Sequence, residues 1–215
     1  MEITWLGQAC FKLEGKDSTL VIDPFDPATG LKLPKSLSAN LLLITHEHHD
    51  HNYRQGVSGN PYEINSPGEY EVAGATVTGI TAFHDKKNGE ERGKITIYLM
   101  EFEGIKICHL GDLGQDLSDD EIDKLGTVDI LMIPVGSTYT IDGEEAAKIV
   151  GEIEPKIVIP MHYKIPGVNT PLELEPVDKF QKKFEGKVEQ EDKLKIKAAN
   201  LPQELKVVVL KSQGK

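Results

Sequence analysis

Residues 41–52 read LLLITHEHHDHN, and this stretch decides how the rest of the chain is interpreted. Four apolar residues and a threonine have the length of a short buried strand. They lead directly into four histidines, a glutamate and an aspartate within six positions. A solvated turn or a capped helix start could also be rich in histidine, so the meaning of this stretch depends on the rest of the chain.

Ligand-type side chains also follow three later apolar segments. His84 follows one of them, Asp112 lies just beyond the second, and His162 follows the third. The segments are residues 75–83, 105–108 and 156–161. Because ligands in layered α/β folds gather at strand ends, we expect these side chains to meet the first cluster.

The spacing within the first cluster indicates metal binding. His46 and His48 are two positions apart, so in an extended segment both side chains point to one side and can hold one metal together. Asp50 and His51 follow after the chain turns and can reach a second metal. Neutral imidazole and carboxylate suit Zn, Fe or Mn, without any cysteine thiolate.

Strand-length apolar segments dominate the first half of the chain, and helix signals appear in the second half. Capping boxes that begin at Ser118 and Asp142 predict a short helix and a second helix that stops before Pro155. A third helix is predicted over residues 176–184. The predicted strands are residues 2–6, 9–14, 19–22, 41–45, 75–81, 94–102, 105–108, 128–133, 156–159 and 205–210. This order predicts an α/β (α+β) fold in which two sheets pack face to face with helices outside, a four-layer αββα sandwich.

Length and charge limit the possible classes of protein. A chain of 215 residues is best interpreted as one domain spanning residues 1–215. Its formal charge of −11 disfavours nucleic acid and anionic membranes as partners. The first residues lack the basic start and long apolar core of a signal peptide, so we expect a cytoplasmic protein. Cys10 and Cys108 form no CxxC pair and are expected to be buried free thiols.

Taken together, these motifs resemble the metallo-β-lactamase fold superfamily, whose hallmark HxHxDH corresponds to residues 46–51. The resemblance covers residues 2–166 and is closest to a small, single-domain branch that includes proteins similar to ascorbate-phosphate lactonases. The other segments that carry it are WLGQACF, VIDPF, SPGEYEV, HLGDLG and IPMHY.

The resemblance implies a site with two metal ions. It assigns His46, His48 and His84 to one ion, Asp50, His51 and His162 to the other, and Asp112 to both. His109 is the rival to His84, but it flanks a glycine turn together with Asp112 and the two would crowd one another on a single ion. Asp23 either accepts an N–H from a ligand histidine or only forms a turn before Pro24. Gln8 stands where relatives often carry a histidine, so the resemblance implies no metal role for it.

The implied function is a metal-dependent hydrolase whose two ions share a hydroxide that cleaves an ester, lactone or phosphoester bond of a small molecule. Zinc is the expected metal, with Mn or Fe as alternatives. Asp112 and Asp50 are the candidate catalytic residues. The alternatives are a phosphodiesterase or nuclease, and a non-catalytic metal-binding protein of the same fold. The sequence leaves the oligomeric state open.

Overall fold

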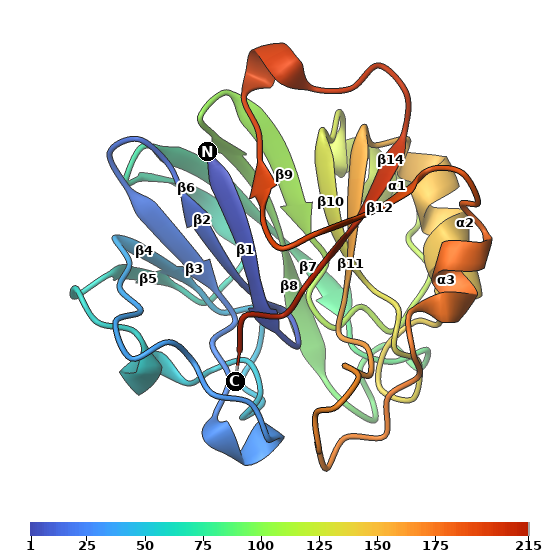
Figure 1. Cartoon of the computed structure of the whole chain (residues 1–215), viewed down its shortest axis with the longest axis horizontal. Helices are drawn as coiled ribbons and strands as arrows, with labels where there is room; N and C mark the ends of the chain where they lie inside the picture. The colour runs from blue at the N-terminus through green and yellow to red at the C-terminus, as the bar shows by residue number, and fades with distance from the viewer. Residues whose placement is uncertain (215) are drawn as a thin grey trace.

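Two β-sheets form the core of the chain in a computed structural model that describes residues 1–214 (Figure 1). Lys215, the last residue of the predicted domain, lies outside the described residues. The first sheet has the strand order β13-β1-β2-β3-β4-β5. Its strands are β1 (Glu2–Gly7), β2 (Cys10–Glu14), β3 (Thr19–Ile22), β4 (Leu41–Leu43), β5 (Tyr62–Ile64) and β13 (Leu194–Lys195).

The second sheet is larger and has the strand order β12-β14-β11-β10-β9-β8-β7-β6. Its strands are β6 (Gly68–Val72), β7 (Ala75–Phe83), β8 (Lys94–Phe102), β9 (Ile105–His109), β10 (Ile130–Pro134), β11 (Ile157–Met161), β12 (Val188–Glu191) and β14 (Lys206–Leu210). Both sheets mix parallel and antiparallel neighbours. Each of the ten predicted strand segments overlaps one of these strands, so the predicted strands are confirmed.

Three α-helices flank the second sheet, at the right of Figure 1. They are α1 (Asp119–Leu125), α2 (Gly143–Ile153) and α3 (Asp178–Lys182). The capping boxes predicted at Ser118 and Asp142 are both formed. Each N-cap side chain accepts the backbone N–H of the N3 residue, and the N3 glutamate side chain accepts the backbone N–H of the N-cap residue. The third helix is shorter than the predicted span of residues 176–184.

The outer face of the first sheet is covered by irregular chain instead of an α-helix. Residues 23–40 and two single-turn 3-10 helices, η1 (Pro27–Thr29) and η2 (Arg54–Gly56), lie over this face. Phe25, Leu31 and Leu37 pack there against the outward side chains of the strands. The predicted fold is therefore confirmed as two mixed sheets with flanking helices, and this outer layer is its irregular part.

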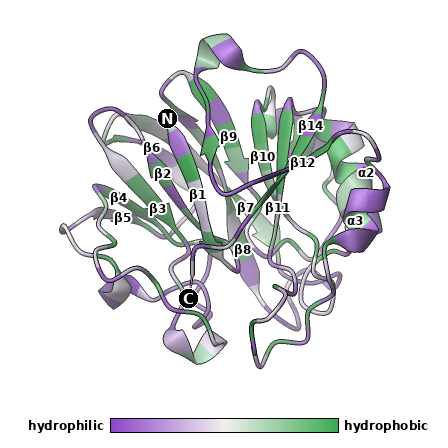
Figure 2. Cartoon of the chain, viewed as in Figure 1, coloured by the Kyte–Doolittle hydropathy of each residue, from purple (hydrophilic) through white to green (hydrophobic). Residues whose placement is uncertain are grey.

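Alternate residues of β3 and β4 enter two different apolar cores, which explains why both strands are apolar throughout. Leu20, Ile22 and Leu43 belong to the core between the sheets, whereas Val21 and Leu42 belong to the outer core. In Figure 2 the central strands are mostly green, and α3 at the surface is mostly purple. No helix within residues 1–214 is long and apolar enough to cross a membrane.

Strand direction brings the ligand-bearing ends together. β7 and β9 both pair antiparallel with β8, so they run in the same direction. β10 pairs parallel with β9 and with β11. The C-terminal ends of β7, β9, β10 and β11 therefore all lie at the same end of the second sheet. The first sheet joins this edge through a backbone hydrogen bond of 2.9 Å from Thr96 N on β8 to Thr45 O after β4.

The C-terminal segment, which carries none of the quoted motifs, ties the two sheets together. It adds β12 to the second sheet, β13 to the first and β14 to the second again, and in Figure 1 it crosses the front of the molecule in red. Gln213 N then donates to Trp5 O on β1 at 2.9 Å.

Candidate metal centre

All seven predicted ligands lie together where strands of both sheets end. They form two groups, and within each group the ligand atoms all lie within 4.8 Å of one another. The first group is His46, His48 and His84, and the second is Asp50, His51, Asp112 and His162. His46 follows β4, and the ends of β7, β9 and β11 supply His84, Asp112 and His162.

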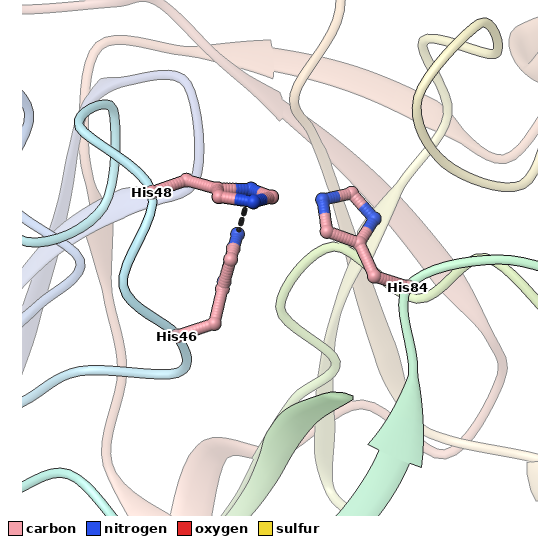
Figure 3. A group of neighbouring side chains, drawn as sticks. All are labelled: His46, His48 and His84. Carbon is pink, nitrogen blue, oxygen red and sulfur yellow. Dashed lines mark hydrogen bonds between the residues drawn. The ribbon is translucent and has the colours of Figure 1, made fainter. Parts of the chain in front are cut away.

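The first group consists of three imidazoles that face one another (Figure 3). His46 Nε2 lies 3.0 Å from His48 Nδ1. The ring of His84 lies opposite, with centroid distances of 4.9 Å to His46 and 5.1 Å to His48. Burial lowers the pKa of His46 to about 2 and also lowers the pKa values of His48 and His84. All three rings are therefore neutral at pH 7, with nitrogen lone pairs free for a metal.

Asp112 contacts both groups with one oxygen. Its Oδ2 lies 3.2 Å from His51 Nε2 and 3.4 Å from His162 Nε2 in the second group. The same oxygen lies 3.4 Å from His84 Nε2 in the first group. Asp50 belongs to the second group alone, with Oδ2 at 3.5 Å from His51 Nε2 and 3.6 Å from His162 Nε2.

The buried atoms of the second group fit a bound cation. His51 Nε2, His162 Nε2 and Asp112 Oδ1 are buried without a hydrogen-bond partner. Buried polar atoms are nearly always paired, so three unpaired ones at one point require an explanation. Within residues 1–214, neither Asp50 nor Asp112 forms an ion pair with a lysine or arginine. A divalent ion would satisfy the nitrogen atoms and the carboxylates together.

The charges of the second group influence one another strongly. Burial alone would lower the pKa values of His51 and His162, but the surrounding carboxylates, Asp112 foremost, raise both above the ordinary value. Burial likewise would raise the pKa values of Asp50 and Asp112, but the same two imidazoles hold them well below their usual range. Without metal, protons bound to His51 and His162 supply the positive charge that balances the carboxylates of Asp50 and Asp112.

Asp23 fixes the tautomers of two ligand histidines, one in each group. Its Oδ2 accepts the Nδ1–H of His51 at 2.9 Å and the hydroxyl of Thr45 at 2.7 Å, and its Oδ1 accepts Thr45 N at 2.8 Å. Because the single hydroxyl proton of Thr45 goes to the carboxylate, Thr45 Oγ1 accepts from His46 Nδ1 at 2.9 Å. Nε2 of both histidines then carries no proton in this tautomer and can bind a metal, and the predicted acceptor role of Asp23 is confirmed.

Two contributors to this centre were missed by the sequence interpretation. Thr45 is one of them: the sequence predicted it only as the last residue of a strand, without its bonds to Asp23 and His46. Asp85, directly after His84, is the other: its carboxylate accepts four backbone N–H groups of the loop between β7 and β8. These hydrogen bonds lower the pKa of Asp85 to about 2. An Asx-type turn signal at Asp85 and Asn88 could have revealed the second contributor.

His109, the rival ligand, has no free nitrogen. It is fully buried, its Nε2 donates to Ala9 O at 2.9 Å, and its Nδ1 accepts Gly111 N at 3.1 Å. It therefore holds the turn before Asp112 in place and has no nitrogen available to bind a metal. His49 lies outside both groups, with 61% of its side chain exposed.

Strained backbone supports the second group. Gln8, Asp23 and His162 all adopt left-handed φ values, between 46° and 51°, which are uncommon for residues other than glycine. The carbonyl of Gln8 accepts His162 N at 3.0 Å, and its side chain is buried. Gly136 packs so closely that a Cβ atom there would lie 1.9 Å from His162 O. The position of His162 is thus set by its backbone contacts.

Comparisons with known proteins agree with this geometry. Residues 2–162 match the protein family described as the beta-lactamase superfamily domain. The chain is 32% identical over 217 residues to a UPF0173 metal-dependent hydrolase of Methanopyrus kandleri, covering 86% of this chain and 92% of the relative. A UPF0173 metal-dependent hydrolase of Thermococcus onnurineus is 32% identical over 191 residues, covering 76% and 84%.

A solved structure extends the similarity to the whole chain. The crystal structure of a proposed Zn-dependent hydrolase of the metallo-β-lactamase superfamily from Thermotoga maritima superposes with a TM-score of 0.83 and 39% identity. The match covers 99% of each chain. On its sequence, its fold and its buried cluster of histidines and aspartates, this chain belongs to the metallo-β-lactamase superfamily and, within it, to the UPF0173 metal-dependent hydrolases.

Proposed function

We propose that this chain is a hydrolase that holds two divalent metal ions and cleaves an ester, lactone or phosphoester bond of a small molecule. The observation that carries this proposal is the position of Asp112 Oδ2, within 3.4 Å of imidazole nitrogens from both ligand groups. Zinc is the metal we propose, because the imidazole and carboxylate set suits it and the Thermotoga maritima relative is named for zinc.

The ligand residues divide between the two ions as the two groups do. His46, His48 and His84 would hold the first, Asp50, His51 and His162 the second, and Asp112 would contact both. When bound, such ions lower the pKa of water toward neutrality and polarise a substrate oxygen.

Two carboxylates of the site, Asp112 and Asp50, are the groups that would act on the proton of the attacking water. Asp112 and Asp50 are both ionised at neutral pH because the neighbouring imidazoles hold their pKa values low. Oδ1 of Asp112 has no hydrogen-bond partner, so it can orient the attacking water and accept its proton. Asp50 contacts the Nε2 atoms of both His51 and His162 and so orients the two imidazole rings toward one position. Asp112 is therefore the proposed base, and Asp50 its supporting ligand.

The substrate class follows from the chain as a whole. A net charge of −11 opposes polynucleotides, so we propose a small molecule over RNA or DNA. The resemblance of the motifs to the ascorbate-phosphate-lactonase-like branch makes lactones the first substrates that we propose to test.

Metal content and turnover test this function together. Protein purified without chelator is analysed for metal per chain and then assayed on lactones, 4-nitrophenyl acetate and bis(4-nitrophenyl) phosphate. We expect about two ions per chain and hydrolysis of at least one substrate, both lost in Asp112→Ala. Full activity in that variant, or a silent panel at two ions per chain, would contradict the proposal.

A further inference from the structure

A cavity of about 410 Å³ opens beside the first ligand group. Its walls include His46 and His48 together with Arg92 and Lys94, and one carboxylate, Glu47, which pairs with Arg54. A second cavity of about 370 Å³ reaches His84, and Arg92 also lines it. Arg92 therefore lines two cavities, each of which is also lined by ligand histidines of the first group or by one of them.

The cations around these cavities differ in whether a carboxylate neutralises them. Lys86 pairs with Glu145, and Lys87 pairs with Glu91 at 2.6 Å. Arg92 and Lys94 have no carboxylate partner within residues 1–214. Both line the cavity beside the first ligand group, in a chain whose formal charge is −11.

Arg92 is held in place through both its backbone and its guanidinium group. Its backbone N–H donates to Asp85 at 2.8 Å, which anchors the end of the loop. Its Nη2 donates to Thr138 O at 3.3 Å, and its Cζ lies 5.6 Å from the centre of the Tyr139 ring. Thr138 adopts a φ of 51°, a strained value for a β-branched residue, and in that conformation it presents the carbonyl to Arg92. These contacts use only part of the guanidinium group, so its other N–H donors are free to bind an anion.

Lys94 is placed by the sheet. It begins β8, and Thr96 two residues on shares its face and lines the same cavity. The N–H of Thr96 bonds to Thr45 O, directly before His46, so this end of β8 is fixed relative to the metal ligands. Lys94 is exposed, and its ammonium can reach a group bound in the cavity.

We propose that Arg92 and Lys94 form a subsite for an anionic group, a phosphate or a carboxylate, carried by the small molecule that this metal site processes. The inference rests on the proposed hydrolase function and adds the charge of the substrate to it. The fork of Arg92 matches the paired oxygens of either anion, and Lys94 adds a point charge beside it.

Binding of small anions tests the subsite apart from catalysis. Zinc-loaded protein is titrated by calorimetry with phenylphosphonate, benzoate and the neutral benzamide, none of which is an ester or lactone. The variants are Arg92→Gln/Lys94→Gln and, as the matched control, Lys86→Gln/Lys87→Gln, which removes two cations that are already paired. Zinc content is measured for every variant, so that an altered metal site would be detected.

The wild-type protein and the control should bind the anions with equal affinity, and Arg92→Gln/Lys94→Gln should bind at least about tenfold more weakly at unchanged zinc content. A loss for phenylphosphonate alone would assign the subsite to phosphate, and a loss for both anions would assign it to either group. Equal affinity in the double variant, an equal loss in the control, or no anion binding by the wild type would overturn the subsite. If anions bind as expected but no substrate is cleaved, the hydrolase function fails and the subsite stands.

Discussion

Replacing Asp23 by asparagine should weaken zinc binding at both ligand groups while the fold is retained. The amide keeps the shape of the carboxylate, and asparagine tolerates the left-handed φ of 46° at this position. Its oxygen can still accept Thr45 N–H. Its NH2 group, however, is a donor where the carboxylate accepts from His51 and Thr45.

The expected magnitude follows from the tautomers. Facing a donor, His51 Nδ1 must become an acceptor, so its proton moves to Nε2, the nitrogen that points at the second ligand group. Thr45 loses its acceptor, so its hydroxyl no longer has to receive the proton of His46 Nδ1. Loss of such a partner typically costs about 10–100-fold in metal affinity, or about 1.4–2.8 kcal/mol. We expect that loss in each zinc-binding step of Asp23→Asn.

Competition with a chromophoric chelator measures both zinc-binding steps, and two further variants make the result specific. Thr45→Val keeps the bond between Asp23 and His51 and should weaken only one step. Asp129→Asn is the matched control, because Asp129 is also a buried carboxylate that accepts two hydrogen bonds but lies before β10, at the other end of the sheet. Zinc affinity of Asp23→Asn within twofold of the wild type, or an equal loss in Asp129→Asn, would refute the tautomer argument.

Three further predictions follow from the same structure. Because the pKa values of His51 and His162 are raised, zinc should displace protons at pH 7, seen as a buffer-dependent enthalpy in calorimetry; identical enthalpies in two buffers would contradict this. Raised pKa values stabilise the metal-free fold fully below pH 6.5 and lose this contribution as pH rises through the folded pKa. The lowered pKa values of His46, His48, His84 and His109 act in the opposite sense over the same range, so the test compares the wild type with His162→Asn by chemical denaturation. The wild type should lose more stability than the variant between pH 6.5 and pH 8, and an equal loss would argue against it. Gly136→Ala should lower stability by about 1–3 kcal/mol through the clash with His162 O, whereas Gly151→Ala, in open space on α2, should raise it by about 0.8–1 kcal/mol; thermal denaturation distinguishes the two.

The site could be predicted from sequence because its ligands lie at strand ends. His84, Asp112 and His162 each follow an apolar segment, and the parallel course of those strands brings their ends to one edge. Two histidines in alternate positions of an extended segment identified the first group. The choice between His84 and His109 came from crowding in the turn, and the structure brings His84 to the ligand group while the backbone occupies both nitrogens of His109.

The strands that the sequence did not reveal are β5, β6, β12 and β13, and each lies at an edge of its sheet. An edge strand contacts the core with few side chains, so its apolar alternation is weak. β12, for instance, has no fully buried residue, and β5 has one. The positions of β12, β5 and β13 depend on pairing with β14, β4 and β1, which are distant from them or separated by loops in the chain. The apolar pattern within each strand contains no information about that pairing.

Partners distant in sequence were also beyond prediction. Thr45 touches Asp23 across 22 positions, and Arg92 reaches Thr138 across 46. Neither residue has a pattern of its own, because a threonine that ends a strand and an arginine in a polar loop occur in every soluble protein. Their roles arise only when β3 pairs with β4 and the loop before β8 meets the loop after β10.

Charge balance explains why this centre is built from so many acidic groups without a permanent cation. Asp23, Asp50 and Asp112 are all buried, and no lysine or arginine within residues 1–214 pairs with any of them. Buried charge without compensation is strongly unfavourable, so positive charge must come from outside the fold or from protons on His51 and His162. A lysine in this place would make the metal-free fold more stable but would compete with the metal for the same carboxylates. Protons can leave when zinc arrives, so histidine allows the same residues to support an empty site and a filled one.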